Sequence, residues 1–132
     1  MSKFTMVQAL NRALDEAMAA DPGVILLGED VASKQGGGVF KVSSGLTEKY
    51  GEARVRATPI SEQAIMGAAV GAALAGFRPV AEIMLMNFVT VAMDQIVNHA
   101  AKLRFMSGGQ TNVPLVIRTT TGVGVGFGGQ HS

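Results

Sequence analysis

The chain has 132 residues, 48% of them hydrophobic, which allows one globular core and makes a single domain the expectation. Eleven basic residues against ten acidic ones leave a formal charge of +1 with no long run of either sign, which argues against nucleic acid or an anionic membrane as a partner. The absence of cysteine excludes disulfides and thiolate metal sites, and two histidines alone disfavour a zinc site.

The N-terminal segment predicts an amphipathic helix. Residues 1–10 lack the long apolar core of a signal peptide, and no later stretch is apolar and long enough to cross a bilayer, so we expect a cytoplasmic protein. Thr5 and Gln8 have the spacing of a capping box. Apolar residues then recur on one helical face as far as the stop at 21–23.

The next segment predicts a buried strand, a loop and a short helix. The unbroken apolar run 24–27, ended by Gly28, is typical of a strand covered on both faces in a parallel sheet. Residues 28–38 include three consecutive glycines and are expected to form a mobile surface loop. A short helix is expected over 46–50, ended by Gly51.

A long helix rich in small residues is predicted in the middle of the chain. Residues 55–57 are a candidate strand, the Thr-Pro pair at 58–59 interrupts the chain, and Ser61 offers an N-cap for a helix ending at Gly76. Alanine and glycine leave this helix almost no polar face. We therefore expect it to be buried and closely approached by another helix or by a partner subunit, and to expose an apolar face to water in the fragment alone.

Two further strands and one helix complete the pattern. Strands are expected over 79–83 and 113–119, with a turn over 84–88 after the first of them. Asn87 is expected to cap a helix, in which one set of residues forms the apolar face and another the polar face. The apolar set is Phe88, Ala92, Ile96, Ala100 and Leu103, and the polar set is Asp94, Asn98 and Lys102.

The alternation of strands and helices predicts a doubly wound, mostly parallel α/β fold. No internal repeat or low-complexity linker is visible. The chain stops at an expected loop-to-helix junction, so we expect residues 1–132 to be the N-terminal part of a longer chain.

The residues around Glu62 in the sequence support two interpretations of its role, one structural and one functional. A carboxylate in the first turn of a helix complements the helix dipole, which is a structural role. Its apolar neighbours would instead desolvate it and raise its pKa, which suits proton exchange near neutral pH. The residues alone leave both readings open.

The glycine-rich end and its histidine are weak signals by themselves. The tail 121–132 lacks the lysine and the spacing of phosphate-binding loops, so a flexible loop is the simpler interpretation. His131 follows it, and a lone histidine is more often structural or exposed than catalytic. Met84, Met86 and Phe88 could be core residues or could wall a flat heterocycle.

Several segments together resemble a known family. They are GED at 28–30, GVFKVSSGL at 38–46, TPISEQAIMGAAVGAALAGFRPVAEIM at 58–84, DQIVNHAAKLRFMSGG at 94–109, VPLVIR at 113–118 and GGQHS at 128–132. In this order they resemble the β subunit of the dehydrogenase component of 2-oxo acid dehydrogenase complexes. The resemblance implies a thiamine-diphosphate-binding, transketolase-like pyrimidine-binding fold that is incomplete at the C-terminus, with the C-terminal domain absent.

The resemblance also implies roles for particular residues. Glu62 matches the glutamate that hydrogen-bonds the aminopyrimidine ring and favours the tautomer that activates the cofactor. Met84 and Phe88 match residues that line the pyrimidine, and His131 matches a histidine associated with the substrate and with acyl transfer to the lipoyl group. Leu115 matches a residue whose backbone carbonyl binds a structural potassium ion in some relatives.

The partners that the resemblance implies are an α subunit and a lipoyl acyltransferase. Two α and two β chains would form a heterotetramer, with magnesium and the diphosphate held by the α chain, and the fragment alone is expected to be inactive. The substrate would be pyruvate, a branched-chain 2-oxo acid or acetoin. Thr119–Thr121 and Met86 depart from common family patterns and leave this choice open.

Two alternatives to the enzyme reading remain. A non-catalytic α/β module could use the small-residue helix only to pair with another subunit. A nucleotide-binding domain is supported by glycine content alone.

Overall fold

The computed structural model describes residues 3–122, 126 and 128–131. In this part of the chain one four-stranded sheet runs in the order β2-β1-β3-β4, and every pairing is parallel. Its strands are β1 (Val24–Glu29), β2 (Val55–Thr58), β3 (Arg78–Leu85) and β4 (Val116–Thr120). The predicted doubly wound, parallel α/β fold is confirmed.

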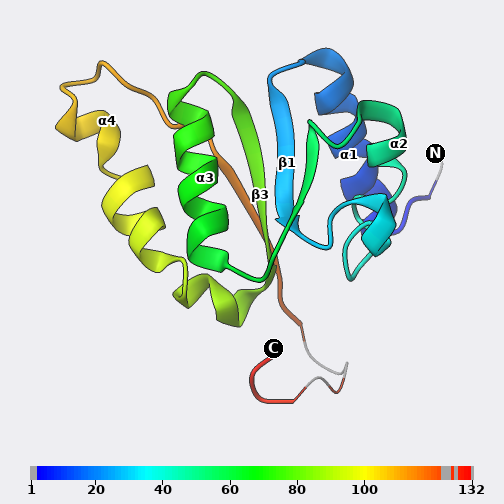
Figure 1. Cartoon of the computed structure of the whole chain (residues 1–132). Helices are drawn as coiled ribbons and strands as arrows, with labels where there is room; N and C mark the ends of the chain where they lie inside the picture. Colours follow the sequence, from blue (N-terminus) through cyan, green and yellow to red (C-terminus); the bar gives the residue numbers. More distant parts are fainter. Residues whose placement is uncertain (1–2, 123–125, 127, 132) are drawn as a thin grey trace.

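Helices cover both faces of this sheet. They are α1 (Met6–Ala20), α2 (Leu46–Tyr50), α3 (Glu62–Leu74) and α4 (Leu103–Met106), with the short helices η1 (Ser33–Gln35), η2 (Met86–Thr90) and η3 (Gln95–Ala100). Figure 1 shows α3 on one side of the sheet and α1 and α2 on the other. Among the described residues, no helix is long and apolar enough to span a membrane.

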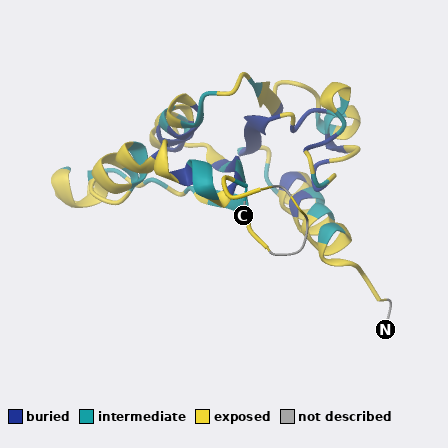
Figure 2. Ribbon diagram, turned by 90° about the horizontal axis from the view of Figure 1, so that it is seen from below, coloured by how far each residue is buried: buried dark blue, intermediate teal, exposed yellow. Residues whose placement is uncertain are grey.

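Two hydrophobic clusters fill the spaces between the layers. Ile25 and Leu27 of β1 pack with Met66 of α3, whereas Leu26 packs with Met18 of α1 on the opposite face. Successive side chains of a strand point to opposite faces, so a strand covered on both sides must be apolar throughout. Figure 2 shows the buried residues concentrated along the sheet between the helices.

Local signals predicted the first two α-helices correctly. The Thr5 hydroxyl accepts a hydrogen bond from the Gln8 N–H at 3.2 Å, and the Gln8 side chain accepts one from the Thr5 N–H at 3.0 Å. The capping box is therefore formed. The predicted helix over 46–50 is also confirmed, and it ends at Gly51 with a φ of 80°.

The predicted surface loop over 28–38 is wrong at its start. β1 continues through Gly28 and Glu29, and Glu29 is only 7% exposed. A side chain on Gly28 would place its Cβ 2.7 Å from the carbonyl oxygen of Glu82 on β3. Glycine is thus needed here for close strand packing and does not end the strand.

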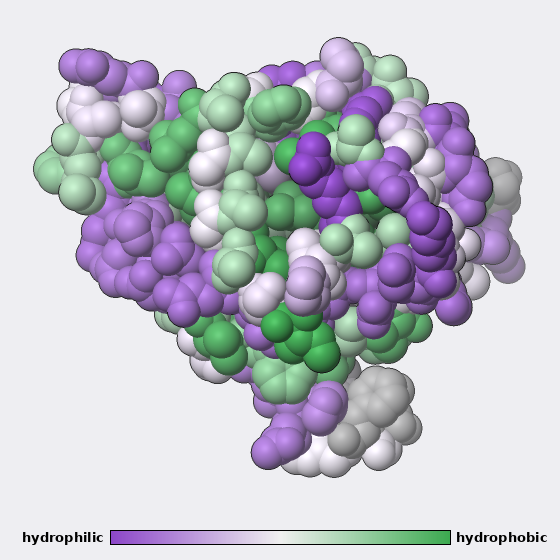
Figure 3. All heavy atoms as spheres, in the orientation of Figure 1, coloured by the Kyte–Doolittle hydropathy of each residue, from purple (hydrophilic) through white to green (hydrophobic). Residues whose placement is uncertain are grey.

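The helix α3 is buried on one side, and on the other it exposes the apolar face that we expect when no partner is present. Its buried residues are Ile65, Met66, Ala69, Val70 and Ala73, which face the sheet. Ala64, Ala68, Gly71 and Leu74 are exposed on its outer side. Figure 3 shows apolar surface over this region of the molecule. Ser61 holds the N-cap position, but its hydroxyl donates to the Pro59 carbonyl at 3.0 Å.

The predicted helix capped by Asn87 is replaced by three short pieces, η2, η3 and α4. Asn87 lies inside the 3-10 turn of η2, because this turn begins directly at the end of β3. The π-helix η3 is closed by a bond from the Ala101 N–H to the Ile96 carbonyl at 3.0 Å. The predicted apolar and polar faces of this segment are confirmed, since Ala92 of the apolar set is buried and Asp94 of the polar set is exposed.

Two strand boundaries also differ from the prediction. β3 takes in the first residues of the predicted turn and runs to Leu85. β4 begins at Val116, three residues later than expected, so Pro114 precedes the strand. Proline has no N–H to donate to a ladder, which fits this position. The predicted loop at the C-terminal end lies partly outside the described residues.

Candidate functional site

Four of the predicted site residues, Glu62, Met84, Phe88 and His131, lie at the carboxyl edge of the sheet or follow it, whereas Leu115 precedes β4 at the amino edge. All strands are parallel, so their carboxyl ends meet at this one edge, where ligands bind in open α/β sheets. Glu62 opens α3 shortly after β2 ends, and Met84 lies near the end of β3. Phe88 follows in η2. The topology therefore collects residues that are far apart in sequence.

Phe88 and His131 are brought into direct contact. Their ring centroids lie 5.4 Å apart and the planes meet at 85°, an edge-to-face arrangement. Both side chains are half-buried, and the His131 N–H donates to the Gly128 carbonyl at 3.3 Å. Phe88 also packs against the cluster that contains Ile65 in the first turns of α3. Phe88 thus connects His131 with the helix that Glu62 begins.

Glu62 lies in a half-buried position at the start of α3. With Val91 and Gln95 it lines a hollow of about 490 Å³ between α3 and the segment formed by η2 and η3. Gly67 lies in the same hollow, where a Cβ would stand 3.3 Å from the side-chain oxygen of Gln95. The carboxylate therefore borders a space that is open to a ligand or to another chain.

Glu29 is a second carboxylate close to Glu62, and the sequence analysis missed it. Burial raises the pKa of Glu29, the charge of Glu62 raises it further, and a hydrogen bond from the Ser61 N–H lowers it. The available signal was an acid at the end of a buried apolar run. A carboxylate in that place sits at the edge where chemistry occurs in this class of sheet.

Several buried polar atoms at this edge have no hydrogen-bond partner among the described residues. They are Glu29 Oε1, Thr58 Oγ1, Arg118 Nε and Thr119 Oγ1. Glu29 and Thr58 are register partners, as are Thr119 and Ile83, so the atoms belong to two pairs of strands, β1 with β2 and β3 with β4. Buried polar groups without partners are rare and are often satisfied by bound groups or water.

Met84 and Leu115 differ in their relation to this edge. Met84 is half-buried and lies at a β-bulge, where the pairing of β3 with β4 shifts between Ile83 and Leu85. Bulges commonly redirect side chains beside active sites. The Leu115 side chain precedes β4 and packs against the core on the α3 face.

Glu82 and Arg118 form a buried ion pair that the sequence analysis did not single out. They are register partners on β3 and β4. Burial raises the pKa of Glu82, while the positive charge of Arg118 opposes that rise. The pair lies on the opposite face of the sheet from α3, because Glu82 alternates with Ala81 and Ile83 of the α3-facing cluster.

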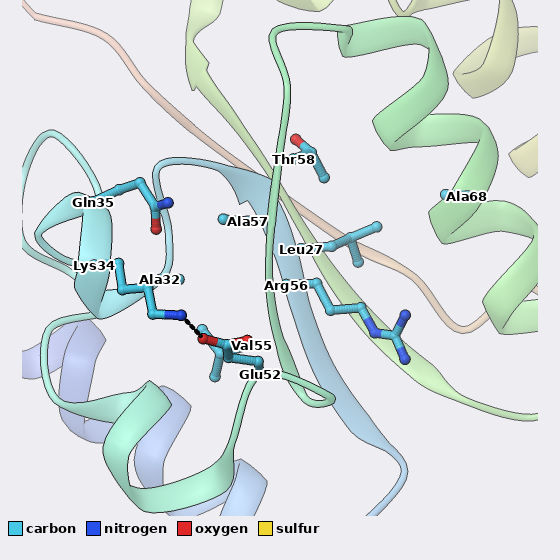
Figure 4. Close-up of a pocket in the computed structure, with 10 residues that line it drawn as sticks. All are labelled: Leu27, Ala32, Lys34, Gln35, Glu52, Val55, Arg56, Ala57, Thr58 and Ala68. Carbon is cyan, nitrogen blue, oxygen red and sulfur yellow. Dashed lines mark ion pairs between the residues drawn. The ribbon is translucent and has the colours of Figure 1, made fainter.

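A second hollow, of about 500 Å³, contains none of the predicted site residues. Figure 4 shows it between β2, η1 and α3, with Leu27 and Val55 in its wall and Arg56 beside it. Lys34 and Glu52 form an ion pair of 2.6 Å at its rim. Ala68 of α3 lines both hollows, so they flank the exposed side of this helix.

These features define a class of protein: a parallel α/β domain whose candidate site lies at the carboxyl edge of its sheet. A carboxylate that begins a helix lies at this edge together with a half-buried methionine and a half-buried phenylalanine. Residues 2–132 match the family described as transketolase, pyrimidine binding domain. The chain belongs to this family.

The chain is also similar to curated proteins over 98% of its length. It is 52% identical to the pyruvate dehydrogenase E1 component subunit beta-1 of rice and 49% identical to the bovine subunit beta, both mitochondrial. It is 46% identical to the subunit beta of acetoin:2,6-dichlorophenolindophenol oxidoreductase from Cupriavidus necator. The chain spans 34%, 36% and 40% of the lengths of these relatives, respectively.

Proposed function

We propose that this chain forms the N-terminal part of the β subunit of a thiamine-diphosphate-dependent 2-oxo acid dehydrogenase component. The β subunit would hold the aminopyrimidine ring, and an α subunit would hold the diphosphate and its magnesium ion. The observation that carries the proposal is the placement of Glu62 at the carboxyl edge, close to the buried carboxylate of Glu29 and at the start of the helix that contributes to the core cluster under Phe88.

The residues at this edge fit the ring chemically. Glu62 would accept a hydrogen bond from a protonated ring nitrogen, and the nearby carboxyl of Glu29 would set the charge around it. Met84 and Phe88 would cover the faces of the ring, since both are half-buried and so keep some surface free. The unpartnered oxygens of Thr58 and Thr119 would accept bonds from the ring or from water.

Two site assignments belong to this proposal. His131 would exchange protons with the substrate or the lipoyl group, from a position fixed by its contact with Phe88. The backbone carbonyl of Leu115 would contribute to a structural potassium site. The names of the relatives in rice, cattle and Cupriavidus necator support a pyruvate or acetoin substrate.

The cofactor, when bound, would supply the nucleophilic carbon and the electron sink for cleavage next to the substrate carbonyl. For a 2-oxo acid, the C1–C2 bond would break and carbon dioxide would leave. The disulfide of a lipoyl group would take up the electron pair as it received the acyl group. The protein would supply ring orientation through Met84 and Phe88 and proton control through Glu62.

The test uses a complete β chain that contains these residues, co-expressed with its α subunit. Thiamine-diphosphate-dependent turnover is measured with pyruvate, branched-chain 2-oxo acids and acetoin, for the wild type, Glu62→Gln and Glu16→Gln. Glu16 is exposed and pairs with Arg12 on α1, so it controls for loss of a carboxylate. We expect Glu62→Gln to lower kcat about 100-fold or more with assembly intact, and Glu16→Gln to leave it unchanged.

A second candidate function, a non-catalytic subunit-pairing module, is favoured by one observation. The outer side of α3 exposes small residues that would let another helix approach closely. This alternative predicts that Glu62→Gln has no effect on any function of the complex. Unchanged turnover in Glu62→Gln, or an assembled wild type that is inactive on every substrate, would favour it.

The proposal extends to the acyl acceptor, to the activity of residues 1–132 alone and to the location of the protein. A lipoyl acyltransferase would accept the acyl group, and residues 1–132 alone would be inactive because half of the cofactor site would be missing. The cytoplasmic location stays a prediction, since the rice and bovine relatives are named as mitochondrial.

A further inference from the structure

Stability alone does not explain the buried ion pair between Glu82 of β3 and Arg118 of β4. The side chain of Glu82 is 2% exposed and that of Arg118 is 13% exposed. Removing two charges from water costs free energy that their attraction only partly returns, so an apolar pair of similar size could often replace them. Buried pairs of this kind can instead fix the geometry of neighbouring segments.

The side chain of Glu82 is buried between β1 and β4. Arg118 binds it from β4, and Gly28 lies directly across from it on β1. A Cβ on Gly28 would stand 2.9 Å from the Glu82 Cβ, so the two strands are in close contact. Glu82 Oε1 also lies 3.5 Å from the position that a Cβ on Gly38 would take. A side chain at Gly28 would therefore crowd Glu82, and Arg118 binds its carboxylate.

The ion pair directly precedes the β-bulge that directs Met84. Ile83 pairs with Thr119, whereas Leu85 pairs with Thr120, so Met84 is the additional residue on β3. Beyond the bulge β3 passes into η2, which carries Phe88. A change in the spacing of β3 and β4 would therefore move both residues that the proposed pyrimidine site requires.

We propose that Glu82 and Arg118 are positioning residues for the cofactor site. Their ion pair holds β3 and β4 in register immediately before the bulge, and this register sets the positions of Met84 and Phe88. This inference rests on the proposed function. It assigns Glu82 and Arg118 no contact with cofactor or substrate, because both lie on the face of the sheet opposite α3.

The test compares two ion pairs that involve β3. Glu82→Gln removes the charge near the carboxyl end, and Asp21→Asn removes the partner of Arg78 at the amino end of the same strand. In the complete β chain assembled with its α subunit, kcat and the apparent KM for thiamine diphosphate are measured together with thermal stability. We expect Glu82→Gln to raise this KM about tenfold, with kcat at saturating cofactor within about twofold.

Asp21→Asn should leave both kinetic constants unchanged. If Glu82→Gln does not assemble, Arg118→Lys keeps the charge on a side chain of different shape and reach, and it should raise the KM about threefold. An assembled Glu82→Gln or Arg118→Lys enzyme with lower thermal stability but a wild-type KM would overturn the positioning role. A wild-type complex that neither binds nor uses thiamine diphosphate would instead overturn the proposed function itself.

Discussion

The imidazole of His131 meets the ring of Phe88 edge to face, with centroids 5.4 Å apart, although the two residues are 43 positions apart in the sequence. The contact anchors the end of the described chain to η2, at the carboxyl edge of the sheet. Since Phe88 is also packed against the α3-facing core, it joins the two parts of the candidate site.

Phe88→Leu should weaken binding of thiamine diphosphate to the assembled complex. Leucine keeps an apolar side chain but loses aromatic stacking, which is worth about 0.5–1.5 kcal/mol, or roughly a two- to tenfold rise in Kd. Phe105→Leu is the matched control, because Phe105 is 89% exposed on α4. Isothermal titration with the cofactor measures both. Equal affinities of the two variants for thiamine diphosphate would show that Phe88 does not contribute to cofactor binding.

Gly28→Ala should destabilise the chain by about 1–3 kcal/mol, the usual cost of overpacking. The new methyl group would stand 2.7 Å from the Glu82 carbonyl oxygen, which belongs to the backbone and cannot easily move. Gly71→Ala is the control, since nothing lies within 4 Å of a Cβ there and alanine favours the helix. Urea unfolding should show a lower free energy of unfolding for Gly28→Ala than for the wild type. For Gly71→Ala the free energy of unfolding should be higher than that of the wild type by about 1 kcal/mol.

Ile65→Ala and Leu74→Ala test which side of α3 is buried. Ile65 is 1% exposed in the core against the sheet, so its truncation should cost about 2–5 kcal/mol. Leu74 on the outer side is 45% exposed, and its truncation should cost less than about 1 kcal/mol. Similar losses for both variants would contradict the one-sided packing of this helix.

The pH dependence of stability should reflect the buried carboxyl of Glu29. Burial raises its pKa in the folded chain above the ordinary 4.5, so the folded chain binds the proton more tightly than the unfolded chain. This contribution to stability is present below pH 4.5 and is lost as the pH rises through the folded pKa. The loss should therefore fall between pH 4.5 and that raised value.

Glu29→Gln removes this titration, so its stability should fall less with rising pH than that of the wild type and should be higher at pH 7. Urea midpoints measured from pH 4 to 8 give the comparison, with Glu16→Gln as an exposed control. Glu82 titrates in the same direction, so some dependence should remain in Glu29→Gln. A wild type and a Glu29→Gln variant with parallel profiles would argue against the raised pKa.

Features that depend on neighbours in sequence were predictable, and features set by distant segments were not. The Thr5–Gln8 capping box lies within one helical turn, so the sequence alone defines it. The burial of Glu29 depends instead on its register with Thr58 and on the Ser61 N–H, which belong to other elements. The pairing of Glu82 with Arg118 likewise requires the alignment of β3 with β4.

Which side of α3 meets the sheet was unpredictable for a different reason. Alanine and glycine fit both a buried and an exposed helical face, so the composition of α3 does not say which side meets the sheet. The π-winding of η3 also has no marker in its sequence, because the same residues would suit an ordinary α-helix. Met84 was predicted as a ring-lining residue, but only the pairing with β4 reveals the bulge there.

Ala68→Glu should block assembly with the α subunit without unfolding the chain. Ala68 is exposed and lines both hollows beside α3, so a charge there meets water in the chain by itself and costs less than about 0.5 kcal/mol. Against a partner helix the same carboxylate would be buried without a counter-charge, which is strongly unfavourable. Ala19→Glu on the exposed side of α1 is the matched control. Co-purification and analytical ultracentrifugation should show a complex for Ala19→Glu and separate chains for Ala68→Glu, whereas a stable complex with Ala68→Glu would exclude this side of α3 as the contact.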